Sequence, residues 1–128
     1  MLDTSVVSEL MRDPGGYART RIAELGDEGL AVSIIVAAEL RFGAAKRGSE
    51  PLARQIEAIL GELDVLPFEP PADRQYARVR EALERAERPI GPNDLLIAAH
   101  ALALDVPLVT ANAGEFERVP GLRVVKWR

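Results

Sequence analysis

Three carboxylate side chains fall where an α/β fold could gather them. Asp3 follows a short apolar stub, Glu39 lies within a helical pattern, and Asp94 stands at the start of an apolar helical run. Ligands of open α/β sheets bind outside the carboxyl ends of the strands. The three positions are far apart in sequence, so only the fold could bring them together. Oxygen ligands select hard cations such as Mg²⁺ or Mn²⁺, and these residues are therefore candidate metal ligands.

Two further polar residues follow the apolar segment "PLVT" near the C-terminus. Asn112 comes directly after this segment and one alanine, and Glu115 comes three residues later. Several carboxylates in one pocket would repel each other and raise their own pKa values unless a cation neutralised them. Such a cation can ionise a water and stabilise charge on a phosphodiester.

Each acid also has a purely structural explanation. Asp3 could cap the helix that follows it. Glu39 could pair with a neighbouring basic residue such as Arg41, and the helix dipole would stabilise Asp94 in a first turn. A buried carboxylate nevertheless needs donors or a cation, which makes Asp94 the hardest of the three to explain by structure alone.

Other polar residues favour structural roles. His100 is the only histidine, and the chain contains no cysteine. Without a second His or Cys at ligand spacing, we expect His100 in the core or at its edge. Thr110 and Asn112 could make a turn after the strand, and Trp127 is expected to pack.

The composition excludes several classes of protein. The 128 residues suit one domain, which we place at 1–128, and 48% are hydrophobic, enough for a substantial core. The absence of cysteine excludes disulfides and thiolate metal sites. The apolar runs are too short to span a bilayer, and the N-terminus lacks a signal pattern. We therefore expect a cytoplasmic protein without a membrane segment.

The charge balance excludes binding of nucleic acid by bulk attraction. The net charge is −4, from 16 basic and 20 acidic residues. A phosphate substrate would have to be bound locally, by a few arginines or by a metal. Arginine supplies 14 of the 16 basic residues; it can hold phosphates in a bidentate manner, although GC-rich coding also explains this bias.

Short apolar strands alternate with helices along the chain. This order is typical of an α/β three-layer sandwich, with a mostly parallel, short-stranded central sheet and helices on both faces. The periodicity, caps and breaks predict helices at 4–12, 17–25, 34–47, 51–63, 69–89 and 92–104, a helical turn at 114–116, and strands at 1–3, 29–33, 64–68, 106–110 and 122–127.

Four segments together resemble the motifs of PIN-domain ribonucleases, in particular the VapC toxins of bacterial toxin–antitoxin pairs. They are "LDTSVVSEL", "VAAELRFGA", "IGPNDLLIAAHALAL" and "LVTANAGEFERVPGLRVVKW". They occur in the family's order and cover nearly the whole chain. "DT" or "AEL" alone would carry no information, but the set is specific.

The resemblance implies an endoribonuclease that cuts single-stranded or loop RNA with Mg²⁺ or Mn²⁺. The acids that match the family's metal ligands are Asp3, Glu39 and Asp94. An activated water would attack a backbone phosphate and leave a 5′-phosphate and a 3′-hydroxyl. The fourth family position, often Asp, is Asn112 here; Asn can ligate a metal or position a water but carries no charge.

The resemblance also assigns supporting residues. Glu115 would partly replace the charge that is missing at Asn112. Thr4 and Thr110 would orient carboxylates or water. Ser5 stands where relatives commonly have Asn, and its hydroxyl can still hydrogen-bond a carboxylate.

The family further implies partners. A VapB-like antitoxin would lay its C-terminal segment across the acidic groove, and the toxin–antitoxin pair would bind promoter DNA, so that DNA is contacted only through the antitoxin. We also expect a homodimer. Segments 6–11, 17–25 and 52–63 are candidate apolar walls for the antitoxin.

Two other functions remain open. Asn112 suggests a catalytically weak subunit that acts mainly through the antitoxin complex and promoter DNA. A phosphotransfer domain with Asp3 as nucleophile ranks last, because "DTS" offers no second acid beside it.

The first strand is unusually short, since only Met1 and Leu2 precede Asp3. Relatives usually have a few more apolar residues there. Either this strand is shortened at its start, or the natural start codon lies upstream.

Overall fold

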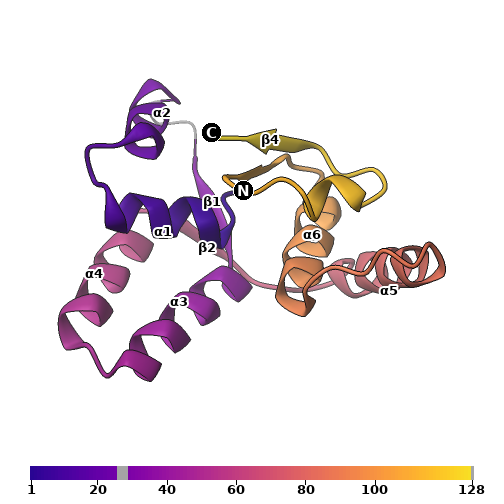
Figure 1. The fold of residues 1–128 in the computed structure, drawn as a ribbon, viewed down its shortest axis with the longest axis horizontal. Coiled ribbons are helices and arrows are strands. Elements are labelled where there is room, and N and C mark those ends of the chain that lie inside the picture. The colour runs from indigo at the N-terminus through magenta and orange to yellow at the C-terminus, as the bar shows by residue number, and fades with distance from the viewer. Residues whose placement is uncertain (26–28, 128) are drawn as a thin grey trace.

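The computed structural model describes residues 1–25 and 29–127, and it confirms the expected α/β fold. Helices α1 to α4 lie on one side of the strands, and α5 and α6 lie on the other (Figure 1). The elements in chain order are α1 (Thr4–Arg12), α2 (Tyr17–Leu25), β1 (Ala31–Ser33), α3 (Ile34–Arg47), α4 (Glu50–Gly61), β2 (Asp64–Leu66), α5 (Ala72–Arg85), α6 (Pro92–Leu104), β3 (Leu108–Thr110), η1 (Phe116–Arg118) and β4 (Val124–Lys126).

Two pairs of parallel strands are joined through a single residue. Strand β1 pairs with β2, and β3 pairs with β4. Leu2 bridges Val32 of β1 and Val109 of β3, both in parallel. The Leu2 N–H donates to the Ala31 carbonyl at 2.8 Å, and the Val109 N–H donates to the Met1 carbonyl at 2.8 Å. The strand order is therefore β2–β1–Leu2–β3–β4.

Leu2 occupies the central position of the sheet, between β1 and β3. The Asp3 N–H still donates to the Val109 carbonyl at 2.9 Å, and helix α1 begins at the next residue, Thr4. Leu2 is fully buried, as expected for the middle of a parallel sheet that is covered on both faces. Asp3 is consequently fixed at the carboxyl end of the central strand.

Local signals explain where several helices begin and end. The Ser33 hydroxyl accepts the Ile35 N–H at 3.1 Å and caps α3, and the Ser49 hydroxyl accepts the Leu52 N–H at 3.2 Å and caps α4. Gly48 ends α3 in the left-handed conformation (φ +62°), which glycine adopts without a steric penalty.

Helix α5 is shorter than the predicted 69–89, and the prediction was wrong at both ends. Glu69 and Pro70 each precede a proline, and this position disfavours helical backbone. At the other end, Glu87 adopts a positive φ of 56°, and Pro89 disfavours helix at the residue before it. The prolines indicate both helix ends in the sequence, but the prediction followed the arginine-rich helical pattern, which extends beyond them.

The remaining differences are small. Each of the four strands spans three residues within its longer predicted range. The helical turn predicted at 114–116 is a 3₁₀ turn at Phe116–Arg118. The predicted end of the helix 17–25 at Gly26 lies outside the described residues.

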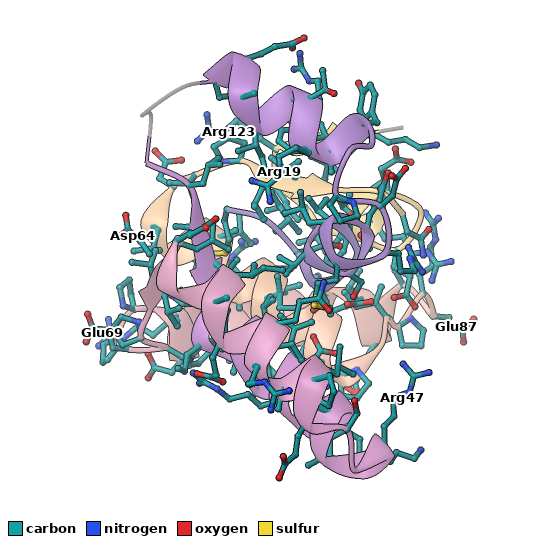
Figure 2. All side chains as sticks on the ribbon, turned by 90° about the vertical axis from the view of Figure 1, so that its left-hand side faces the viewer. Arg19, Arg47, Asp64, Glu69, Glu87 and Arg123 are labelled. Carbon is teal, nitrogen blue, oxygen red and sulfur yellow. The ribbon has the colours of Figure 1, made fainter. Side chains whose placement is uncertain are left out.

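The apolar faces point inward as predicted. The residues that fill the core include Val6, Val7 and Leu10 of α1, Ile56 and Leu60 of α4, Val79 and Leu83 of α5, and the buried middle of α6. Trp127 packs in this core, as expected. Charged side chains such as Arg47, Glu69 and Glu87 project from the edge of the molecule (Figure 2). None of the helices in the described ranges has both the length and the apolar character to cross a bilayer.

His100 is a core residue, as expected, with 1% of its surface exposed. Its Nδ1 lies 2.7 Å from the Ser33 hydroxyl, and the Phe68 ring packs edge-on at 5.5 Å between centroids. The Ser33 hydroxyl also accepts the Ile35 N–H, and the imidazole tautomer sets the direction of its hydrogen bond with Nδ1. Burial lowers the pKa of His100, so the buried imidazole is neutral at neutral pH.

Replacing Leu2 should test how far the sheet depends on it. We expect Leu2→Ala to lower the free energy of unfolding by about 2–5 kcal/mol, because it removes a fully buried side chain. Leu104→Ala is the control, since Leu104 ends α6 and is 44% exposed; it should cost less than about 1 kcal/mol. Chemical denaturation measures both values, and equal losses would contradict the central role of Leu2.

His100 should make stability depend on pH. Burial lowers its pKa in the folded protein, although the Pro67 carbonyl and Glu69 oppose this. Below about pH 6.5, the unfolded chain binds a proton that the folded chain resists, so the free energy of unfolding should fall as pH decreases from 7 to 5. Urea titrations should show a flatter decrease for His100→Gln. A parallel decrease in both proteins would refute this assignment.

Candidate active site

Asp3 is the most enclosed of the acids, with 4% of its surface exposed. Its Oδ1 accepts the Ser5 hydroxyl at 2.6 Å and the Val6 N–H at 3.2 Å, and its Oδ2 accepts the Thr110 hydroxyl at 2.6 Å. Burial raises the pKa of Asp3, and these hydrogen bonds oppose the rise. Asp3 therefore caps α1, and the Thr110 hydroxyl of β3 also binds its carboxylate.

The hydroxyls of Ser5 and Thr110 connect the start of α1 to the loop after β3. The two oxygens lie 3.3 Å apart. The Ala111 N–H donates to the Ser5 hydroxyl and the Asn112 N–H donates to the Thr110 hydroxyl, both at 3.0 Å. The supporting roles predicted for Ser5 and Thr110 thus correspond to direct contacts with Asp3.

Glu39 is held by two neutral donors. Its Oε1 accepts the Thr4 hydroxyl at 2.6 Å, and its Oε2 accepts the Asn93 amide at 3.3 Å. The alternative in which it pairs with Arg41 is not observed, because Arg41 forms a bidentate pair with Glu57 at 2.9 Å. Thr4 therefore orients a carboxylate, as predicted, and that carboxylate belongs to Glu39.

Asp94 and Glu115 form a carboxylate pair. Their side chains are hydrogen-bonded to each other, and the pKa of Asp94 is raised to about 7. Burial is the largest cause, followed by Glu115, and the charges of Glu39 and Asp3 add to the rise. With a pKa of about 7, Asp94 binds a proton about half of the time at neutral pH.

Glu115 is the ionised member of this pair. The pKa of Glu115 is lowered by the hydrogen bond from Asp94, by the Gly91 N–H and by the charge of Arg118. The Gly91 N–H donates to Oε1 at 3.3 Å. Arg118 also donates to the Pro89 carbonyl at 3.1 Å, which fixes the segment before Gly91.

The structure therefore brings Asp3, Glu39, Asp94 and Glu115 into one region. Within residues 1–25 and 29–127, none of the ion pairs involves these four acids. In the same ranges, no three His, Asp or Glu side chains lie in an arrangement that could hold a metal ion. The acids are close enough to perturb one another but are held by hydroxyl and amide donors.

Asn112 lies at the edge of this region. Its side chain is exposed, and its backbone N–H donates to the Thr110 hydroxyl. Glu115 contacts Asp94 directly and is the fourth acid of the region. The role of Asn112 as a ligand or water-positioning residue stays a prediction.

Sequence reasoning missed three residues around these acids. The Asn93 amide donates to Glu39, and from the sequence Asn93 was only part of the predicted helix 92–104. Arg118 follows Glu115 by three positions, a spacing at which side chains are neighbours on a helical turn. Gly91 could not have been identified, because its N–H reaches Glu115 only through the fold.

Comparisons with known proteins agree with this architecture. A model of the PIN domain matches residues 1–122. Ribonuclease VapC2 of Rickettsia felis is 35% identical over 129 residues, which cover 99% of this chain and 96% of the relative. The tRNA(fMet)-specific endonuclease VapC of Shigella flexneri is 34% identical over 128 residues, with the same coverage.

A solved structure shows the same fold. VapBC2 from Rickettsia felis, bound to a DNA fragment from their promoter, contains a chain that superposes with a TM-score of 0.93 at 32% identity. The match covers 100% of this chain and 98% of that one. The resemblance in the four motifs is confirmed: this chain belongs to the PIN-domain family and, within it, to the VapC ribonucleases.

Proposed function

We propose that this chain is a metal-dependent endoribonuclease toxin that hydrolyses RNA phosphodiester bonds and is neutralised by a cognate antitoxin. The observation that carries the proposal is the convergence of Asp3, Glu39, Asp94 and Glu115, none of which forms an ion pair within the described parts of the chain. Membership of the VapC ribonucleases supports the same reaction.

The donor set fits Mg²⁺ or Mn²⁺. Asp3, Glu39 and Asp94 would hold the ion, and Glu115 adjoins Asp94. All the donors are oxygens, which hard cations prefer, and the raised pKa of Asp94 reflects a local excess of negative charge that a cation would offset. When bound, such an ion lowers the pKa of a water and stabilises negative charge on phosphate oxygens.

The protein's own groups would prepare the site. Ser5 and Thr110 fix both oxygens of Asp3, and Thr4 fixes one oxygen of Glu39. These donors are neutral, so they orient the carboxylates without cancelling their charge. Asp94 has a pKa of about 7, so metal binding would have to displace the proton from the protonated fraction.

The proposed partner is a VapB-like antitoxin, because the similar Rickettsia felis chain is part of a VapBC complex on promoter DNA. DNA would then be contacted through the antitoxin, and we also propose a homodimer. Three segments were expected to contact the antitoxin. In the first of them, residues 6–11, the side chains of Val6, Val7 and Leu10 are buried in the core. The half-buried Ile22 and Leu52 of the other two segments keep part of their surface accessible.

A catalytically weak subunit is the second candidate. Two observations favour it: Asn112 is exposed and uncharged, and the described acids do not yet form a ligand set. Calorimetric titration with Mn²⁺ separates the two candidates, because a weak site would bind the ion poorly or not at all.

Removing the charge of a proposed ligand should stop cleavage. We expect Asp94→Asn and Asp3→Asn to lower Mn²⁺-dependent RNA cleavage by more than the roughly 10–100-fold that is typical of outer-shell changes. Asp105→Asn is a matched control, because Asp105 ends the same helix α6 and its side chain is 96% exposed. Chelation by EDTA should stop the wild type, and Mn²⁺ should restore it. Undiminished cleavage by both variants would refute the nuclease assignment.

Removing a supporting hydroxyl should have a smaller effect. Thr110→Val preserves shape but deletes the hydrogen bond to Asp3 and the acceptor of the Asn112 N–H. We expect Mn²⁺ affinity to fall by about 10–100-fold, measured by calorimetry. Thr20→Val is the control, since this exposed hydroxyl contacts only the Gly16 carbonyl. Unchanged affinity in Thr110→Val would show that Asp3 does not depend on this hydroxyl.

A further inference from the structure

A pocket of about 240 Å³ lies between α5 and the start of α6. The carboxylates described above do not line it. Figure 1 shows how the connection after α5 runs back along that helix to reach α6. The lining residues that matter here are Tyr76, Arg80 and Glu84 of α5, and Ile90, Pro92 and Leu95 of the opposite wall.

The pocket and the acidic site share one wall. Ile90 and Pro92 line the pocket. Gly91, between them, donates its N–H to Glu115, and a Cβ built on it would lie 3.7 Å from Asp94 Oδ2. A single short segment therefore contacts the pocket through two of its residues and the carboxylates through the residue between them.

The chemistry of the pocket suits a flat, aromatic ligand with polar edges. The Arg80 guanidinium lies 5.9 Å from the centre of the Tyr76 ring, and Nη1 donates to the Tyr76 hydroxyl at 2.9 Å. Arg80 also pairs with Glu84, but at 3.6 Å and with both side chains more than half exposed, so this pair is weak. Bases stack on tyrosine rings and on arginine planes, and Glu84 can accept hydrogen bonds from a base edge.

The local charge also suits a polyanion. Residues 72–88 contain five arginines and four acids, a net charge of +1, in a chain whose net charge is −4. The remainder therefore carries −5. A phosphate backbone approaching the acidic site therefore meets less repulsion along this segment than the average for the chain.

We propose that this pocket receives one unpaired base of the RNA substrate, from a nucleotide close to the cleaved phosphate, stacked against Tyr76 and Arg80. The inference rests on the proposed nuclease function and adds a source of substrate selection. Pockets for drug-sized ligands span about 300–1,000 Å³, so this smaller space suits a single base. A base held in a duplex could not enter it, which selects single strands and loops.

The test combines a change in the pocket with a change in the substrate. The probe is a short fluorescent single-stranded RNA, compared with versions that lack the base at one position near the cleavage site. In the wild type, one abasic position should raise KM about fivefold or more, the lower range for base–aromatic stacking, with little change in kcat. Tyr76→Leu should show the same rise in KM on intact RNA, and the abasic RNA should raise its KM no further.

Three other variants serve as controls. Tyr76→Phe keeps the ring and should bind intact RNA like the wild type, whereas Arg80→Gln should raise KM. Arg78→Gln changes an exposed arginine of the same helix that contacts Gln75 and does not line the pocket, and it should have little effect. Because Tyr76 packs against the core, circular dichroism must show that each variant is folded; if Tyr76→Leu is not, Arg80→Gln carries the comparison.

The outcomes separate this inference from the proposed function. Two results would refute the base-binding role of the pocket while leaving the nuclease function intact. One is an equal rise in KM on abasic RNA in the wild type and in Tyr76→Leu. The other is an unchanged KM for intact RNA in both Tyr76→Leu and Arg80→Gln. Weaker inhibition by the antitoxin with unchanged RNA binding would assign the pocket to a protein and overturn it too. Anisotropy with the non-cleaving Asp94→Asn background measures binding alone, so a Tyr76-dependent affinity would support the pocket even if no RNA were cleaved.

Discussion

The rest of the structure depends on the position of Leu2 between two strands. Its backbone joins β1 to β3, and its side chain fills the centre of the core. The next residue, Asp3, is thereby fixed beside the end of β3, where Thr110 meets its carboxylate at 2.6 Å. Because Leu2 is paired with a strand on each side and directly precedes Asp3, the sheet and the candidate site have the same anchor. A displacement of this residue would move both.

The candidate site is supported almost entirely by neutral donors. Thr4, Ser5, Thr110 and the Asn93 amide hold the carboxylates, while basic side chains form their ion pairs elsewhere on the surface. A guanidinium paired directly with these acids would relieve their repulsion but would also compete with an incoming cation, and Arg118 acts on Glu115 through its charge without an ion pair among the described contacts. Hydroxyls and amides position carboxylate oxygens and leave their charge available. The raised pKa of Asp94 is the electrostatic consequence of this arrangement.

Local signals in the sequence predicted much of the fold. The helices 4–12, 34–47 and 92–104 were placed correctly, because a cap or a proline marks each start. The helix at 69–89 was overestimated, because periodic charges outweighed the prolines. Contacts within the site were harder to predict from the sequence, because their partners are far apart along the chain. Asp3 and Thr110 are separated by 107 positions, and Glu39 and Asn93 by 54. Such pairs follow from sheet order and helix packing, which no local pattern encodes. For the same reason the hydrogen bond between Glu115 and Asp94 could not be predicted, because only the fold brings these two side chains together.

The double role of Asp3 has a consequence for how this chain can evolve. The same carboxylate begins helix α1, through the Val6 N–H, and presents charge to the site. Ser, Thr and Asn could replace the cap but not the charge. Glutamate would keep the charge on a longer side chain that is not among the preferred caps. Selection for a folded chain and selection for an active one therefore act on the same two oxygen atoms, and a lineage that lost the activity could drift to Asn at this position while its first helix stayed intact.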